Sequence, residues 1–442
     1  MAPPEINEVR RALGLGEGED LVAEEWATSM ASLPEGCPPF LRSDFVAEAC
    51  AYVGLPPEVT AEVVAGAGSI AARRECVALA WHMRRLLIER KGRAGLWLVP
   101  ARAFGDGAGI FNLLLLLALV PEARQFHEAR GIPRPIVADT MSDFLLCMRR
   151  YRAIHGVWGV ADMYLAGWLL NHLRGDIYRL GRLQYIHSSF RQLVIAFRHR
   201  VTRAVVVLLL AEREFRRDGY VNGAGGVTEQ DGVWTPTYIE AAEEVIGHPV
   251  DPARGCALRY TVHLPKQQWQ CVLGPGEPVL DIHIPAGSPL DPDACRDSLH
   301  RATEFFPRYF PDKPFKAFCC SSWLFDCQLE QYLPPTSNIV RFLRQFYLLP
   351  VSGDGWGAVR FVFNLLEGRD GGRAIPSDAT PESIELKNLP RRTRLERAIL
   401  DHIERGGHWR NSGALLLVED LPDYGSDIYR RQAHPWAEKV KT

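Results

Sequence analysis

The chain has 442 residues, which is enough for two or three domains of about 150 residues each. Its 51 basic side chains nearly balance 53 acidic ones, and this excludes a general binder of nucleic-acid backbones, which needs a basic excess. Hydrophobic residues make up 47% of the chain, with 11 Trp, 13 Tyr and 19 Phe, so an intrinsically disordered protein is excluded as well.

The start of the chain, Met1-Ala-Pro-Pro-Glu5, is polar and acidic and predicts no secretory signal. The longest apolar stretch, near Ile110–Val120, has about half of the ~20 residues that a membrane span needs, so it predicts a buried helix. None of the ten cysteines forms a CxxC pair. We interpret them as reduced, mostly buried thiols of a cytoplasmic protein.

The first 176 residues predict an all-α domain, because apolar residues recur there at helical spacing and strand-like alternation is scarce. The expected helices are Phe45–Val53, Pro57–Val64, Ala71–Glu89, Gly109–Leu119, Ser142–Ile154 and Asp162–Leu173.

After Asp176 strands and helices mix, which predicts an α/β or α+β domain over residues 177–420, followed by a polar, peripheral tail over 421–442. The expected strands are Ile177–Ile186, Leu193–Phe197, Ala257–Leu264, Val279–Pro285, Phe315–Trp323 and Tyr347–Val351. The expected helices are Tyr238–Ile246, Pro292–Tyr309, Ser337–Phe346 and Leu395–Arg405. Val201–Leu210 fits either a helix or a strand, and Gly223–Gly232 predicts a turn-rich loop.

Several catalytic motifs are missing from the sequence: there is no GxSxG, no GxxxxGK[ST] and no HExxH. Gly105-Asp-Gly-Ala-Gly109 resembles a dinucleotide-binding loop only in part, because Ile110 stands where that motif needs Gly or Ala. We interpret it as the entry to a helix. The 13 histidines show no metal-ligand spacing, and no metal or redox cofactor is expected.

The most informative stretch is Val279–Trp323, which predicts a strand, a loop, a helix and a second strand. The loop Ala286–Leu290 contains a glycine, and the helix begins with Asp291 as N-cap and Pro292 at its first position. Backbone N–H groups at this helix start could hold an anion such as the pyrophosphate of a nucleotide. An ordinary βαβ unit whose helix is capped by Asp291 remains the alternative.

Asp281 and His283 lie two residues apart on the first of these strands and therefore project from one face of the sheet. A carboxylate beside an imidazole orients the ring and favours its protonated form, so the pair could act as a general base. A partly buried polar pair without a catalytic role is the alternative. Cys319 and Cys320, on the second strand, are interpreted as core residues in preference to an acyl-cysteine nucleophile.

Segments along the whole chain resemble a bacterial acyltransferase family with an N-acyltransferase N-terminal domain and a GNAT-like C-terminal domain. The C-terminal resemblance is carried by Tyr178-Arg-Leu-Gly-Arg-Leu-Gln-Tyr185, His283-Ile-Pro-Ala-Gly287, Cys320-Ser-Ser-Trp-Leu-Phe-Asp326, Ser337-Asn-Ile-Val-Arg-Phe342, Leu389-Pro-Arg-Arg-Thr393 and Gly406-Gly-His-Trp-Arg-Asn411. The N-terminal one is carried by Ala129-Arg-Gly-Ile-Pro133 and Asp139-Thr-Met-Ser-Asp143.

The resemblance implies a mixed, splayed central sheet in which acyl-CoA lies between the strands Val279–Pro285 and Phe315–Trp323. The donor-binding residues it implies are Ile284, Ala286, Gly287, Ser288 and Leu290. The loop departs from the usual pattern [RQ]xxGx[GA], because it has a single glycine and neither Arg nor Gln.

The expected activity is transfer of an acyl group from acyl-CoA to a small-molecule or peptide amine. His283, supported by Asp281, would deprotonate the amine, and Ser337 or Tyr332 would protonate the leaving thiolate. Two alternatives remain: an acyl-carrier protein or aminoacyl-tRNA as donor, and a regulatory module that binds acyl-CoA without turnover. No membrane partner is expected, nucleic acid is disfavoured by the charge balance, and the oligomeric state is left open.

Overall fold

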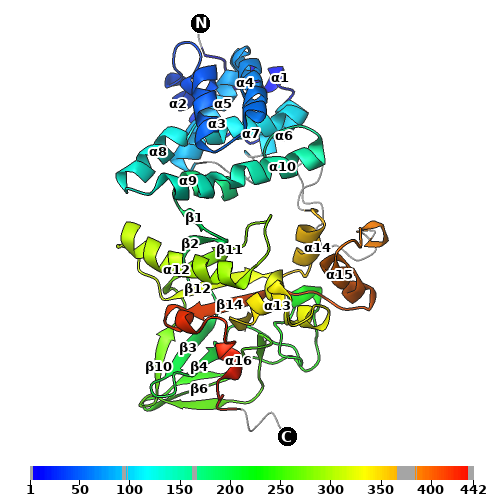
Figure 1. Cartoon of the computed structure of the whole chain (residues 1–442). Helices are drawn as coiled ribbons and strands as arrows, with labels where there is room; N and C mark the ends of the chain where they lie inside the picture. Colours follow the sequence, from blue (N-terminus) through cyan, green and yellow to red (C-terminus); the bar gives the residue numbers. More distant parts are fainter. Residues whose placement is uncertain are drawn as a thin grey trace. The chain divides into compact units, whose positions relative to one another are not determined.

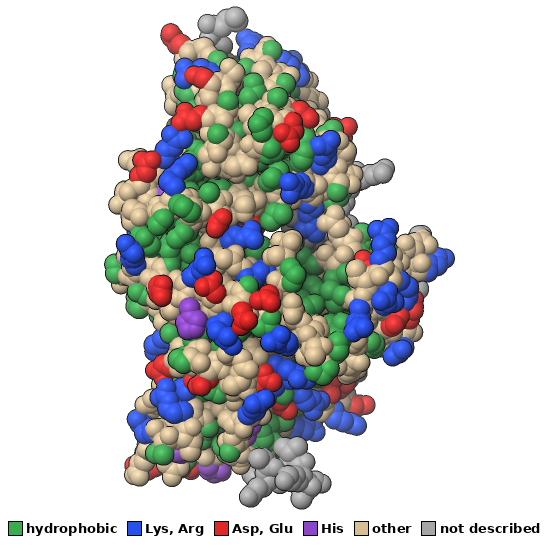
Figure 2. Space-filling model, in the orientation of Figure 1, with side chains coloured by type: hydrophobic (Ala, Val, Ile, Leu, Met, Phe, Trp, Pro, Cys, Tyr) green, Lys and Arg blue, Asp and Glu red, His purple; other side chains and the backbone are tan. Residues whose placement is uncertain are grey.

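A computed structural model of the chain describes residues 3–91, 96, 98–161, 167–365, 384 and 386–436. These residues form two compact units, one ending at Arg179 and the other beginning at Leu180 (Figure 1). On the face drawn in Figure 2, basic and acidic side chains are intermingled, as the balanced composition predicts.

The first unit is helical, as predicted, with no strand among its described residues before Ile177. Its helices are α1 (Ile6–Ala12), α2 (Trp26–Ala31), α3 (Ser43–Tyr52), α4 (Pro57–Ala71), α5 (Arg74–Glu89), α6 (Val99–Phe104), α7 (Ala108–Leu117), α8 (Val120–Ala129), α9 (Arg134–Met141), α10 (Asp143–His155) and α11 (Leu169–Leu173). The first part of the predicted helix Asp162–Leu173 lies outside the described residues.

Helix α7 is the core helix of this unit, and every one of its residues except Ile110 is buried. A Cβ on Gly109 would lie 2.5 Å from Cε1 of Tyr151, so only glycine allows this close packing. The helical stretch Val99–Ala129 is long and apolar enough to cross a membrane, but 67% of its most apolar window is buried inside the protein. The prediction of a core helix is confirmed, and Gly105–Gly107 is the expected helix entry.

We expect the buried imidazole of His127 to make this unit less stable in acid. Its Nδ1 lies 2.9 Å from the hydroxyl of Tyr52, and burial lowers the pKa of His127 to about 4. The unfolded chain takes up a proton near pH 6.5, which the folded chain resists, so this contribution to stability is lost as the pH falls from about 6.5 to 4. We expect a loss of about 3 kcal/mol over that range, measured by urea unfolding. Replacing His127 by Phe should flatten the pH dependence, whereas replacing the exposed His300 by Gln should not. An unchanged slope in His127→Phe would contradict this assignment.

The second unit is organised around a mixed six-stranded sheet. In spatial order its strands are β1 (Ile177–Leu180), β2 (Leu183–Ser189), β11 (Pro278–His283), β12 (Ala317–Ser322), β14 (Ser412–Leu417) and β13 (Tyr347–Pro350). Only the β11/β12 pair is parallel among the pairings described for this sheet. The predicted mixed central sheet is therefore confirmed.

Helix α12 (Pro292–Tyr309) connects the two parallel strands and has the predicted bounds. It packs on the sheet through aromatic rings: Phe306 meets Tyr185 of β2, with 6.3 Å between ring centroids. Tyr185 in turn contacts Phe318 of β12 at 5.7 Å. The other helices of this unit are α13 (Asn338–Leu343), α14 (Gly357–Val362), α15 (Arg394–Glu404) and α16 (Ile428–Arg431).

The predicted single strand Ile177–Ile186 is wrong, because the chain turns back on itself within it. Gly181 and Arg182 separate β1 from β2. Gly181 has φ +77°, a left-handed conformation that glycine adopts without strain. This turn places Arg182 at the end of the sheet where β11 finishes, because β2 is antiparallel to β11.

Small sheets lie between β2 and β11 in the sequence. They are β10-β3-β4, β5-β6-β9 and the pair β7-β8. Their strands are β3 (Val194–His199), β4 (Val205–Leu209), β5 (Tyr238–Glu240), β6 (Glu244–Gly247), β7 (Val250–Asp251), β8 (Cys256–Ala257), β9 (Val262–Pro265) and β10 (Trp269–Leu273). The ambiguous stretch Val201–Leu210 is thus a strand, and Ala257–Leu264 is divided between β8 and β9.

The predicted helix Tyr238–Ile246 is wrong: this stretch is the hairpin β5/β6. Ile239 pairs with Ile246, and β6 pairs on its other side with β9. The helix-favouring residues between the two strands form the turn. Sheet pairing, which the local sequence does not contain, decides the conformation.

The interpretation of the C-terminal segment as a peripheral tail is wrong for residues 423–436. Tyr429 is fully buried, and Trp436 belongs to the core cluster around β4. The side-chain oxygen of Gln432 accepts a hydrogen bond from the backbone N–H of Val205 at 2.8 Å. This segment is therefore part of the second unit, while residues 437–442 lie outside the described ones.

Candidate active site

The parallel strands β11 and β12 separate toward their carboxyl ends. They are registered only at Leu280–Phe318 and Asp281–Cys319. Beyond that point β11 continues to His283 and β12 to Ser322, with no registered pair between these parts of the two described strands. Ligands of open α/β sheets bind at the carboxyl ends of the strands. The carboxyl ends of the two strands are therefore unpaired with each other at the predicted position.

The loop after β11 is the predicted donor-binding loop. Ala286, Gly287 and Ser288 are exposed, Ile284 is half-buried, and the Leu290 side chain is buried. Gly287 has φ +101° and no neighbouring atom within 4 Å of a Cβ built on it. Exposed backbone that is free of side-chain cover can approach a ligand closely.

Backbone N–H groups are available in this loop and not at the start of helix α12. The Asp291 side chain accepts hydrogen bonds from the N–H groups of Asp293 at 3.1 Å and Ala294 at 3.0 Å, as the predicted N-cap does. Among the described residues, no acceptor is recorded for the N–H groups of Ala286, Gly287 and Ser288. If this part of the chain binds an anion, the free donors are in the loop and not at the helix start.

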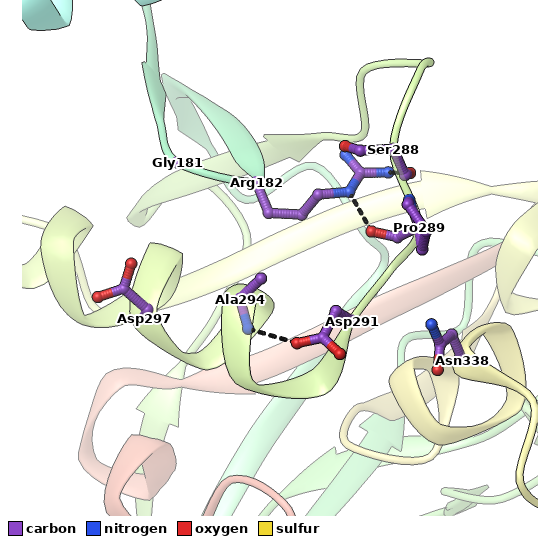
Figure 3. Close-up of a pocket in the computed structure, with 8 residues that line it drawn as sticks. All are labelled: Gly181, Arg182, Ser288, Pro289, Asp291, Ala294, Asp297 and Asn338. Carbon is purple, nitrogen blue, oxygen red and sulfur yellow. Dashed lines mark hydrogen bonds between the residues drawn. The ribbon is translucent and has the colours of Figure 1, made fainter.

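An open pocket of about 530 Å³ adjoins the loop (Figure 3). Its lining residues are Gly181, Arg182, Ser288, Pro289, Asp291, Ala294, Asp297 and Asn338. Arg182 is the only cation among these eight described residues. Asp291 is occupied as the helix cap, and the carboxylate of Asp297 pairs with Nε of Arg301 at 2.8 Å. The negative charge of each of these two carboxylates is thereby partly offset by its own hydrogen-bonding or ionic partner.

His283 and Asp281 lie on the predicted strand, two residues apart on one face. The Asp281 carboxylate is hydrogen-bonded to Ser188, and burial raises its pKa. No hydrogen bond or ion pair between Asp281 and His283 is recorded for these two described residues. The structure thus places Asp281 in the last registered pair of the two strands and His283 just beyond it. The support of His283 by Asp281 stays a prediction.

Ser337 and Tyr332 differ in their surroundings. Ser337 precedes α13 without a side-chain capping bond, and the next residue, Asn338, lines the pocket. The hydroxyl of Tyr332 lies 3.0 Å from Nδ1 of His402, and its ring packs in the core cluster around Trp409. Only Ser337 is therefore adjacent to the pocket with no recorded partner for its hydroxyl in the described chain.

Two family models cover most of the chain. Residues 44–175 match the N-acyltransferase N-terminal domain, and residues 177–416 match the GNAT-like C-terminal domain. The chain belongs to this GNAT-like acyltransferase family. The predicted family is confirmed, and the protein is an acyltransferase. No curated protein matches the chain.

Solved structures share the fold of this GNAT-like acyltransferase. A crystal structure of an acyltransferase in complex with decanoyl-CoA and teicoplanin is 24% identical, with a TM-score of 0.58 over 95% of this chain and 100% of that one. An acyltransferase mutant in complex with octanoyl-CoA is also 24% identical, with a TM-score of 0.57 over 94% and 99%. At this identity the likeness shows a common fold.

The cysteines of the GNAT-like domain do not suit a covalent mechanism. Burial raises the pKa of Cys319 well above its ordinary value and that of Cys320 to about 12. A nucleophilic cysteine needs a lowered pKa, because the thiolate is the reactive form. The interpretation of both as core residues agrees with this. All ten cysteines of the chain are free thiols.

Two residues of the site were not identified from the sequence. Arg182 contacts the loop, and Gln184 lies directly opposite His283 in the β2/β11 register. Gln184 is fully buried, and neither polar atom of its amide has a hydrogen-bond partner in the described part of the chain. Burying such an unpaired group costs about 1–3 kcal/mol, so Gln184 is a candidate for hydrogen bonding to a substrate. The one sequence signal that could have identified Gln184 is the alternation of polar and apolar residues in this strand, where Gln184 precedes Tyr185.

Proposed function

We propose that this protein transfers an acyl group from acyl-CoA to an amine at the carboxyl ends of β11 and β12. The observation that carries the proposal is that these strands are not paired at their carboxyl ends, where β11 continues into a loop whose backbone N–H groups have no recorded acceptor in the described chain. A parted pair of strands can receive the extended thioester arm, and oriented N–H groups suit the diphosphate of the nucleotide.

The nature of the donor is supported by what the similar solved structures contain. Acyltransferases of this fold were crystallised with decanoyl-CoA, with octanoyl-CoA and with CoA. We therefore propose acyl-CoA for this chain in preference to an acyl-carrier protein or an aminoacyl-tRNA. The balanced charge of the chain further disfavours tRNA.

In the proposed reaction the neutral amine attacks the thioester carbon, and His283 accepts the proton that the nitrogen loses as the carbon–nitrogen bond forms. An imidazole is suited to this role near neutral pH. Backbone N–H groups at the parted ends of the strands would stabilise the developing oxyanion. The carbon–sulfur bond then breaks, and the thiolate takes a proton. We assign the delivery of this proton to the Ser337 hydroxyl, which takes up a proton from solvent as it gives one. Tyr332 is less suited, because its hydroxyl is already hydrogen-bonded to His402.

We propose a small-molecule or peptide amine as acceptor. One similar acyltransferase was crystallised with teicoplanin, which supports a small-molecule acceptor of that kind. The free thiols agree with a cytoplasmic location, where acyl-CoA is made, and we include that location in the proposal.

Binding of acyl-CoA is tested by thermal unfolding and calorimetry with CoA and with acetyl-, octanoyl- and decanoyl-CoA. A ligand at a hundredfold excess over its Kd should stabilise the fold by about 2.7 kcal/mol. Release of free CoA thiol in the presence of an amine panel then separates an enzyme from a module that only binds. Adenosine 3′,5′-bisphosphate is the control for binding through the nucleotide alone. The proposal is refuted if none of these thioesters produces either a thermal shift or binding heat.

A further inference from the structure

The loop between β11 and α12 lacks the Arg or Gln that phosphate loops of GNAT folds commonly carry, yet a cation reaches it from elsewhere. Arg182, in the turn between β1 and β2, is only 8% exposed. Its guanidinium donates hydrogen bonds to the carbonyl oxygens of Pro285 at 3.0 Å, Ser288 at 2.8 Å and Pro289 at 2.8 Å. Figure 3 shows the side chain extended from the β1/β2 turn toward the loop.

We propose that Arg182 is a positioning residue that presents the backbone N–H groups of this loop to the diphosphate of acyl-CoA. The inference rests on the proposed function and names the part of the donor that Arg182 serves. Arg182 replaces, from a position 107 residues before Pro289, the basic residue that the loop does not contain.

Peptide geometry supports this assignment. The carbonyl of Pro285 and the N–H of Ala286 belong to one planar trans peptide, and so do the carbonyl of Pro289 and the N–H of Leu290. Because Arg182 binds both carbonyls, both N–H groups point away from the guanidinium. Neither N–H group has a recorded acceptor in the described chain. They therefore point to the side of the loop opposite the guanidinium and are held in that orientation.

The charge of Arg182 acts on the same groups. A cation hydrogen-bonded to a carbonyl polarises the peptide and strengthens the donor on its other side. Arg suits this role because its planar fork binds several oxygens at once, whereas the ammonium of Lys is a single point charge. Arg182→Lys keeps the charge and loses the fork, and Arg182→Gln keeps two donors and loses the charge.

Two acyl donors that carry the same thioester distinguish a loss of diphosphate binding from a general loss of activity. Octanoyl-CoA carries the diphosphate, and octanoyl-pantetheine does not. We expect both Arg182 variants to lower kcat/KM for octanoyl-CoA by about 10- to 100-fold, mostly through KM, as the loss of a charge-assisted contact predicts. The kcat/KM for octanoyl-pantetheine should change by less than about threefold.

The matched control is Arg216→Lys. Arg216 is also buried and donates to the carbonyls of Ala224 and Val227 at 3.1 Å, in a loop that does not line the pocket. This variant should leave the ratio between the two donors unchanged. Equal losses for both donors in the Arg182 variants, or none for octanoyl-CoA, would overturn the inference.

If neither Arg182 variant folds, a measurement on the wild-type protein tests the inference. Hydrogen exchange at the N–H groups of Ala286 and Leu290 should slow on addition of CoA and not of pantetheine. If hydrogen exchange at these two N–H groups is unchanged while CoA is bound, the inference about Arg182 is overturned but the proposed function is not. Absence of any CoA binding or turnover in the wild-type protein overturns the proposed function and the inference together.

Discussion

Replacing His283 by Gln should lower kcat/KM by about 10²- to 10⁴-fold, the range for loss of a general base. His283 ends β11 where this strand parts from β12, next to the donor loop. Gln retains a polar side chain of similar reach but cannot take up the proton of the amine. The loss of kcat/KM in the variant should become smaller as the pH rises, because more of the acceptor is then already a neutral amine. Steady-state release of CoA thiol between pH 6 and 9 measures both effects.

The folded state should change little in His283→Gln, by about 1 kcal/mol if one modest hydrogen bond is lost. His263→Gln, an exposed histidine on β9, is the control for a His-to-Gln change elsewhere in the same unit. Near-normal kcat/KM in His283→Gln would refute the role of general base. An unfolded variant would support a structural role for the ring instead.

Helix α12 shows what the sequence predicts well. Its N-cap, the proline at its first position and its apolar periodicity all lie within the segment itself, and the predicted bounds are those of the structure. Strand β14, in contrast, is absent from the prediction, although it lies between β12 and β13 in the central sheet. Its sequence, Ser412-Gly-Ala-Leu-Leu-Leu417, has no β-branched residue and no alternation, because all six residues are buried. Its conformation is decided by its neighbours.

The candidate site divides in the same way. The shared face of Asp281 and His283 follows from the two-residue period of a strand, and the loop position follows from the capping signals of α12. The contacts of Arg182 with Pro285, Ser288 and Pro289 join residues more than a hundred positions apart. The turn at Gly181, which brings Arg182 there, falls within a stretch that looks like one continuous strand. A short-range pattern cannot contain such contacts.

The largest effect on stability is expected at a buried ion pair that joins strand β3 to the segment after β14. Nη2 of Arg198 lies 2.8 Å from Oδ2 of Asp420, and these side chains are only 1% and 4% exposed. The hydroxyl of Tyr429 donates to the same carboxylate oxygen at 2.8 Å. Removing Asp420 takes away the buried partner of this guanidinium and leaves it only the exposed carboxylate of Glu419, 3.6 Å from its Nε.

Asp420→Ala should therefore lower the free energy of unfolding by about 3–5 kcal/mol, seen as a lower midpoint in urea. The neighbouring Glu419 is the matched control. Its carboxylate pairs with Arg203 and lies 3.6 Å from Nε of Arg198, but its side chain is 61% exposed. Glu419→Ala should cost less than about 1 kcal/mol, the usual value of a surface pair. An Asp420→Ala variant as stable as Glu419→Ala would show that water reaches Arg198 and that the pair contributes little. A large difference between these adjacent positions would instead establish that burial, and not charge alone, sets the energy of this contact.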